Sequence, residues 1–106
     1  MFFKELEAFP VKEILPGFFG KFIHTENMTL AFWKISSGSI LPEHSHIHEQ
    51  VANITEGKFE LTIEGTTRIL IPGHIAIIPS GSKHSGKALT DCSILDVFTP
   101  KREDYQ

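Results

Sequence analysis

The chain has 106 residues, which is long enough for a single domain over residues 1–106 and too short for two. Its formal charge of −3, with 41% hydrophobic and 22% charged residues, indicates neither nucleic acid nor an anionic membrane surface as a partner. No stretch approaches the roughly 18 apolar residues of a membrane span, and the single Cys92 fits a reducing compartment, so we expect a cytoplasmic protein.

The N-terminal segment predicts little regular structure. Its charged residues interrupt the apolar run that a signal peptide would need, and residues 4–15 have room for one helical turn that Pro10 interrupts. Phe2 and Phe3 are large apolar side chains at a terminus, where a partner's sheet could cover them. They favour a homodimer, and the alternative is that they pack on their own domain.

The chain from residue 18 onward alternates between apolar and polar residues, and turn residues interrupt this pattern at short intervals. Period-two alternation predicts β-strands, and no segment predicts a helix of three turns. The predicted strands are residues 18–24, 29–35, 51–55, 58–63, 68–71, 75–78 and 92–98. About eight short strands in so small a chain predict an all-β sandwich or barrel. The charged tail, residues 99–106, would either dock across the surface or fray.

Residues 44–50, His-Ser-His-Ile-His-Glu-Gln, hold three of the six histidines of the chain. In an extended strand, residues two apart share a face and lie about 6.6–7 Å from one another. His44 and His46 would then converge on one cation, and Gln50 has the same parity and offers a carbonyl oxygen. A further ligand must come from elsewhere, and His84 is the candidate, because the turn before it would bring the following strand alongside the first.

The spacing of nine residues around these candidates is specific. They form two blocks: Gly38, His44, His46, Gln50 and Gly57, then Gly73, Pro79, Gly81 and His84. This pattern resembles the two-motif signature of the cupin superfamily, whose fold is a small jelly-roll β-barrel, also called a double-stranded β-helix. The resemblance implies that His44, His46, Gln50 and His84 bind one divalent metal ion. Three imidazoles and one amide oxygen suit zinc, nickel, iron, manganese or copper.

Gln50 departs from the family pattern, in which glutamate is common at this position. The amide removes one negative charge from the ligand set, so a bound divalent ion would be held less tightly but would be a stronger Lewis acid. The other histidines are less informative. His48 is expected beside the site or exposed, His74 is expected to be exposed, and His24 is assigned no role.

The last predicted strand holds a carboxylate among apolar residues. Asp96 shares one strand face with Ile94 and Phe98, whereas Leu95 and Val97 take the other. Both faces are largely apolar, so parity leaves open which of them lines the interior. If Asp96 lies inside, burial raises its pKa while a nearby cation lowers it, a combination that is common for a general acid or base.

Residues 95–104, Leu-Asp-Val-Phe-Thr-Pro-Lys-Arg-Glu-Asp, resemble the C-terminal segment of small single-domain cupins of the pectin-degradation type. That resemblance implies that the protein converts 4,5-unsaturated uronate monosaccharides to their open-chain keto form. It also implies that Asp96, Phe98 and Arg102 are site residues. Asp96 would move the proton, Arg102 would grip the substrate carboxylate, and Phe98 would offer an apolar face to the sugar. The alternative for Arg102 is a surface ion pair.

Two other functions would use the same small-molecule site. One is a cupin dioxygenase with the same metal ligands, and the other is a module that binds a small molecule through the metal and catalyses nothing. An Asp96 that faces the metal favours the uronate enzyme over both. Phe32 or Trp33 could also contact a sugar, although aromatic residues on strands are more often part of the core.

Overall fold

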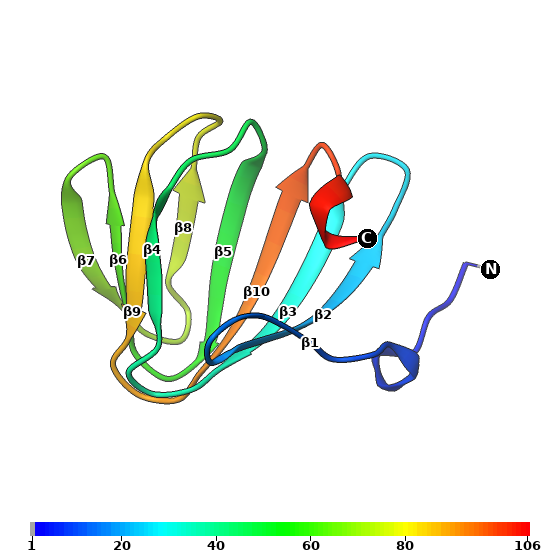
Figure 1. Ribbon diagram of the computed structural model, residues 1–106, viewed down its shortest axis with the longest axis horizontal. Helices are drawn as coiled ribbons and strands as arrows, with labels where there is room; N and C mark the ends of the chain where they lie inside the picture. Colours follow the sequence, from blue (N-terminus) through cyan, green and yellow to red (C-terminus); the bar gives the residue numbers. More distant parts are fainter. Residues whose placement is uncertain (1) are drawn as a thin grey trace.

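Alternating apolar and polar residues build two antiparallel β-sheets that pack face to face in the computed structural model, which describes residues 2–106 (Figure 1). The larger sheet has the order β1-β2-β3-β10-β5-β8, and the smaller has the order β4-β9-β6-β7. The strands are β1 (Lys12–Leu15), β2 (Phe18–His24), β3 (Thr29–Ile35), β4 (Ile40–His44), β5 (Glu49–Glu56), β6 (Phe59–Ile63), β7 (Thr66–Leu70), β8 (Ile75–Ile78), β9 (His84–Ala88) and β10 (Cys92–Thr99). The predicted all-β jelly-roll architecture is confirmed.

Each segment with clear period-two alternation forms a strand, and β2, β3 and β8 have the predicted bounds. The pattern does not predict β1 or β4, and it indicates β9 only as the segment after a turn. In β4, Pro42 breaks the alternation, but it is tolerated because β4 is an edge strand of its sheet. In β9, Gly86 lies where an added Cβ would come within 2.4 Å of the Phe59 ring, so the packing requires a residue without a side chain.

The space between the sheets is filled by apolar side chains at one end and by polar ones at the other. The largest buried apolar residues are Phe18, Phe22, Trp33, Ile35, Ile54, Phe59, Leu61, Leu70, Ile78, Ile94 and Phe98. Burying one such side chain contributes about 1.5–3 kcal/mol. The apolar end holds the two sheets together, which leaves the other end available for the site.

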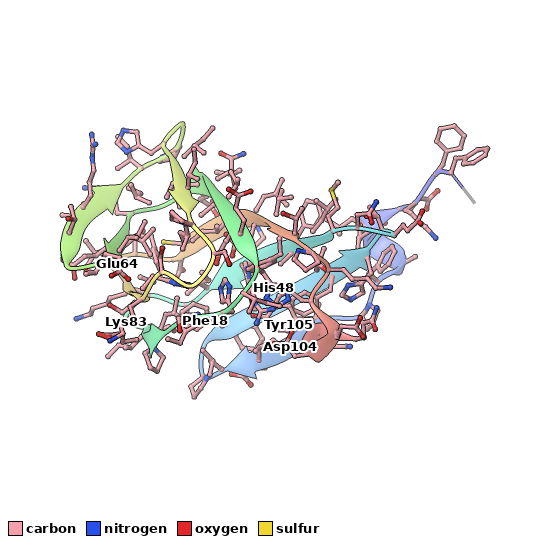
Figure 2. The ribbon with its side chains drawn as sticks, turned by 90° about the horizontal axis from the view of Figure 1, so that it is seen from above. Phe18, His48, Glu64, Lys83, Asp104 and Tyr105 are labelled. Carbon is pink, nitrogen blue, oxygen red and sulfur yellow. The ribbon has the colours of Figure 1, made fainter. Side chains whose placement is uncertain are left out.

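The C-terminal tail docks on the barrel instead of fraying. A short 3-10 helix, η2 (Glu103–Tyr105), lies beside the ends of β3 and β10 (Figure 1). The ring of Tyr105 packs against Phe22 at a centroid distance of 4.7 Å and against Phe98 at 6.0 Å. Figure 2 shows Asp104 and Tyr105 on this helix, over the same end of the barrel as His48. The tail therefore covers the polar end of the interior.

The N-terminal segment extends away from the two sheets (Figure 1). Its one helical turn is η1 (Leu6–Ala8), which ends before Pro10, as the sequence predicts. Phe2 is 88% exposed and Phe3 is 91% exposed, so neither packs on its own domain. Neither of the short helices within residues 2–106 is long and apolar enough to cross a membrane.

Candidate functional site

Two of the predicted metal ligands face each other across neighbouring strands. His44 ends β4, His84 begins β9, and the two are directly paired in the antiparallel register of these strands. The register shifts between Leu41 and His44, which is the mark of an irregularity such as a β-bulge. The centroids of the two rings are 4.1 Å apart, and His84 is only 1% exposed.

His46 does not reach the site through strand pleating, so this part of the prediction is wrong. β4 ends at His44 and β5 begins at Glu49, and the residues between them form a loop. The loop is held by the turn that precedes His84: the backbone N–H of Gly81 donates to the His46 carbonyl oxygen at 2.8 Å. Gly81 has a φ of +78°, a conformation that glycine adopts without strain. His46 therefore meets the other two histidines because two distant turns are hydrogen-bonded together.

The tautomers of the three histidines follow from their backbone contacts. Each Nδ1 lies against a backbone carbonyl oxygen two residues away, at 2.9 Å for His44, 2.9 Å for His46 and 3.0 Å for His84. A carbonyl oxygen only accepts, so each Nδ1 carries the proton and donates it. Each Nε2 of the neutral ring then has a free lone pair. Such backbone contacts orient histidine rings as metal ligands.

The three rings fit a metal ion. One ring nitrogen from each of His44, His46 and His84 lies within 4.8 Å of the others. Nitrogens that are each about 2.1 Å from one tetrahedral ion lie about 3.4 Å apart, so the rings would need to close by up to about 1.4 Å, which small side-chain rotations supply. The Nε2 of His84 is buried and has no hydrogen-bond partner within the described chain. The three histidines could therefore hold a metal ion.

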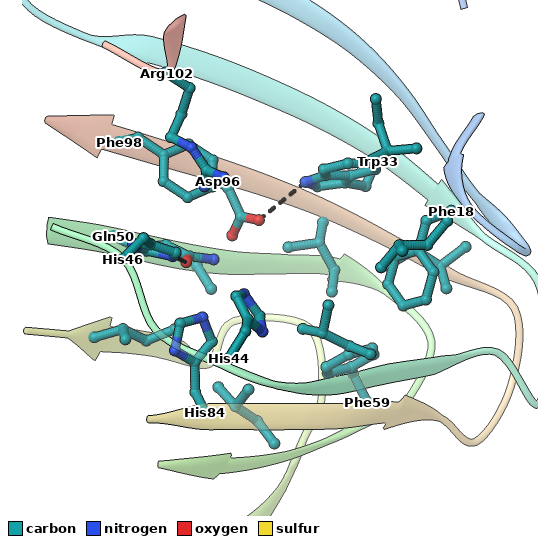
Figure 3. Close-up of a pocket in the computed structure, with 18 of the residues that line it drawn as sticks. Phe18, Trp33, His44, His46, Gln50, Phe59, His84, Asp96, Phe98 and Arg102 are labelled. Carbon is teal, nitrogen blue, oxygen red and sulfur yellow. Dashed lines mark hydrogen bonds between the residues drawn. The ribbon is translucent and has the colours of Figure 1, made fainter. Parts of the chain in front are cut away.

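Gln50 lines the same cavity as the three histidines and offers an amide oxygen beside them. Its Oε1 lies 3.2 Å from the Nε2 of His46 (Figure 3). Both atoms are acceptors when the Nδ1 of His46 carries the proton, so a shared cation would stabilise this contact. Burial, followed by the charge of Arg102, lowers the pKa of His46 to about 4, and burial also lowers the pKa of His84. Both rings are neutral at pH 7, as metal ligands must be.

Asp96 lies inside the barrel, which decides the question that parity left open. It is 7% exposed, and its Oδ2 accepts a hydrogen bond from the Trp33 indole at 3.0 Å (Figure 3). Its Oδ1 is buried without a partner among residues 2–106. Burial raises the pKa of the Asp96 carboxyl from 3.8 to about 6, although Gln50, Trp33 and Arg102 oppose this rise. A carboxyl group with this pKa can both accept and release a proton near neutral pH.

Arg102 is buried at the same end of the barrel. It also forms an ion pair, as the alternative for this residue expects, but from a buried position and not at the surface. Its Nη2 lies 2.7 Å from the Oδ2 of Asp104. Its guanidinium carbon lies 4.7 Å from the centroid of the Phe98 ring. The Phe98 ring is in turn 5.7 Å from the His46 ring. One cavity between the sheets is lined by Arg102, Phe98 and Asp96 together with the three histidines and Gln50.

Some residues that support this site were not predicted to do so. The sequence indicates Trp33 as a sugar contact or a core residue, and in the structure its indole N–H also donates a hydrogen bond to Asp96. Thr29, which is fully buried, accepts a hydrogen bond from the backbone N–H of Arg102 at 2.8 Å and also contacts His24. Only the pairing of β3 with β10 and the path of the tail reveal these contacts. His48 and His74 are half-buried, so the expectation that His74 is exposed is wrong.

Comparison with known sequences places these residues in a family context. A family model described as a cupin domain matches residues 31–98. Pectin degradation protein KdgF of Dickeya dadantii (strain 3937) is 33% identical to this chain over 99 residues. The alignment covers 91% of this chain and 90% of that protein. The likeness therefore extends over nearly the whole of both chains.

Solved structures agree with this relationship. KdgF from Halomonas sp. has a TM-score of 0.88 with this chain and 29% sequence identity, and the match covers 94% of each chain. An RmlC-like cupin from Shewanella frigidimarina NCIMB 400 has a TM-score of 0.94 and 23% identity, over 100% of this chain and 96% of that one. The second likeness shows the fold alone.

Proposed function

The chain belongs to the cupin domain family and is related to pectin degradation protein KdgF, and on this premise we propose that it opens the ring of a 4,5-unsaturated uronate to give the linear keto acid. One observation carries the proposal: the buried carboxyl group of Asp96 lines the same cavity as the three histidines, and one of its oxygens has no partner within the described chain. A carboxylate in such surroundings is costly to the fold, which favours a chemical role.

The reaction is an isomerisation in which protons move and one ring bond breaks. The substrate ring is an enol ether that is closed by a hemiacetal. Removal of the proton from the anomeric hydroxyl breaks the bond between the anomeric carbon and the ring oxygen, giving an aldehyde and an enolate. Return of that proton to the neighbouring unsaturated carbon then converts the enolate to a ketone. The chemistry needs one group that accepts a proton and returns it, and no oxidant.

The side chains at the site suit these steps. Asp96 takes the proton on its unpartnered oxygen and returns it, while Trp33 holds the other oxygen. Arg102 binds the substrate carboxylate through its guanidinium, and Phe98 packs against the sugar. His44, His46, His84 and Gln50 would hold one divalent ion, whose contribution when bound is to polarise substrate oxygens as a Lewis acid. The position of Asp96 favours this function over an oxygen-using cupin or a binding module.

Turnover of unsaturated galacturonate tests the proposal. Metal-loaded protein is expected to remove the ultraviolet absorbance of the conjugated double bond at least about 100-fold faster than the spontaneous conversion. The product should show a ketone carbon in its ¹³C spectrum. Oxygen uptake with the same substrate would instead indicate a dioxygenase. Tight binding without turnover, unchanged in an Asp96→Ala variant, would indicate a binding module.

We further propose that the functional form is a homodimer of single-domain chains in the cytoplasm. Phe2 and Phe3 project from the body of the chain, and the outer face of the larger sheet has a groove lined by Val11, Phe19 and other apolar residues. Insertion of the two N-terminal rings into this groove of a second copy would cover both surfaces. A reducing cytoplasm suits the single free thiol, which is buried.

Light scattering of fractionated protein would test the dimer. Because each phenylalanine buried at the interface contributes about 1.5–3 kcal/mol, the double variant Phe2→Ser/Phe3→Ser is expected to weaken dimerisation at least about 100-fold. Lys4→Ser changes a polar residue of the same segment and should leave the dimer intact. A wild-type protein that elutes as a monomer at high concentration would contradict the proposed assembly.

A further inference from the structure

The guanidinium of Arg102 is held by a carboxylate from its own tail. The Nε–H of Arg102 donates to the Oδ1 of Asp104 at 2.9 Å, and an Nη2–H donates to the Oδ2 at 2.7 Å. This two-point contact is the geometry in which arginine and carboxylate pair most strongly. Hydrogen bonds from Arg102 also lower the pKa of Asp104, so the Asp104 carboxylate is charged at neutral pH.

The two partners lie at different depths. The side chain of Arg102 is 9% exposed, whereas that of Asp104 is 56% exposed. Asp104 therefore binds the guanidinium from the solvent side. The guanidinium carbon also lies 4.2 Å from the centroid of the Tyr105 ring and 4.7 Å from that of Phe98. Two rings and one carboxylate thus limit its movement.

The ion pair leaves part of the guanidinium for another anion. Of its five N–H donors, the contact with Asp104 uses the Nε–H and one on Nη2. The second Nη2–H and one Nη1–H form the other edge of the same rigid plane. Because the plane is rigid, a carboxylate that fixes one edge also fixes the direction of the other. Figure 3 shows the Arg102 side chain running from the tail toward Asp96, which lies inside the cavity.

We propose that Asp104 is a positioning residue that fixes the guanidinium of Arg102, so that its second edge selects substrates with a carboxylate. This inference rests on the proposed function, because it extends the role of Arg102 in that reaction. Asp104 does not touch the substrate. Its removal leaves the guanidinium in place between its aromatic contacts but free to turn within its plane.

Kinetics of Asp104→Asn with unsaturated galacturonate test this role. The variant keeps the shape of the side chain but loses one of the two charge-assisted contacts, so KM is expected to rise about tenfold. The value of kcat should stay within about threefold of wild type, because Asp96 and the histidines are unchanged. Asp104→Glu keeps the charge and should recover part of the loss. Glu103→Gln is the matched control, since it removes a charge from the exposed neighbouring residue of η2.

A second measurement does not depend on turnover. The chain has only two arginines, Arg68 and Arg102, so a ¹⁵N spectrum of the side-chain Nε–H groups has two signals to assign. Arg68 is exposed and serves as the internal reference. In the wild type and in Glu103→Gln, the Arg102 signal should be sharp and slow to exchange with water. In Asp104→Asn it should broaden and exchange faster, while the Arg68 signal stays the same.

The outcomes separate the possible explanations. An Asp104→Asn variant with the KM and Arg102 signal of Glu103→Gln would overturn the proposal. A lower KM would also overturn it, because Asp104 would then compete with the substrate for the same edge. If both kcat and the thermal stability of Asp104→Asn fall, Asp104 has only a structural role, and the proposal is overturned. If the wild type itself does not convert the substrate, the proposed function fails, and the Arg102 signal alone decides whether Asp104 positions the guanidinium.

Discussion

Replacing Asp96 with asparagine is expected to slow ring opening at least about 100-fold, because general acid–base catalysis typically contributes about 10²–10⁴-fold. The amide has nearly the same shape and can still accept the hydrogen bond from Trp33, but it cannot take up and return a proton. The measurement is the decay of ultraviolet absorbance with unsaturated galacturonate, at saturating substrate. Both the rate and the metal content of each preparation should be recorded.

The same variant should be at least as stable as the wild type. Asp96 is buried, and one of its oxygens has no partner in the part of the chain that the structure describes. Exchanging a buried carboxylate for a neutral amide therefore removes an unfavourable interaction from the folded state. An unchanged or higher Tm would show that lost activity is not lost folding. Asp91→Asn, in the exposed turn before β10, is the matched control and should keep full activity. Equal rates for Asp96→Asn and wild type would exclude Asp96 as the proton carrier.

Removing either of two paired histidines is expected to abolish metal binding and, with it, activity. His44→Ala and His84→Ala each delete a ring from the facing pair on β4 and β9. Loss of groups that only orient a ligand typically costs about 10–100-fold in metal affinity, so loss of a ligand itself should cost more. Elemental analysis after gel filtration should find about one ion per wild-type chain and almost none in either variant.

His74→Gln is the control for this pair, because His74 is a half-buried histidine in the turn between β7 and β8, away from the other three. It should bind the ion as the wild type does. Thermal unfolding with and without added metal gives a second readout, since an ion that binds only the folded state raises the Tm. Retention of a stoichiometric ion in both His44→Ala and His84→Ala would refute the ligand assignment.

The Asp96 and histidine variants should also be distinguishable from each other. Asp96→Asn is expected to keep its metal and lose its rate, whereas the histidine variants lose both. If loss of Asp96 also released the ion, its carboxylate would be acting on the ligand set through Gln50 and not on the substrate. This comparison separates proton transfer from metal retention with the same set of purified proteins.

The local features of this protein are predictable from its amino-acid sequence. Strand positions follow from alternation, because a residue every second position must face one side of a sheet, and this holds whatever the strand pairs with. The two-block spacing from Gly38 to His84 is also visible in the sequence. Gly57, the last residue of the first block, shows why such a position is fixed. It has a φ of +85°, and a Cβ there would come within 2.1 Å of the Asp91 carbonyl oxygen. Such constraints restrict the residue type directly.

The tertiary structure alone decided which side chains meet. Parity places Asp96 with Phe98 but does not say which face is inside, because both faces of β10 are largely apolar; pairing with β3 and β5 makes the choice. His46 reaches the site from a loop held by the turn at Gly81, and Arg102 is buried because the tail folds back onto Thr29. These contacts join residues far apart in the chain, and their energies depend on packing and hydrogen bonds that no local pattern contains.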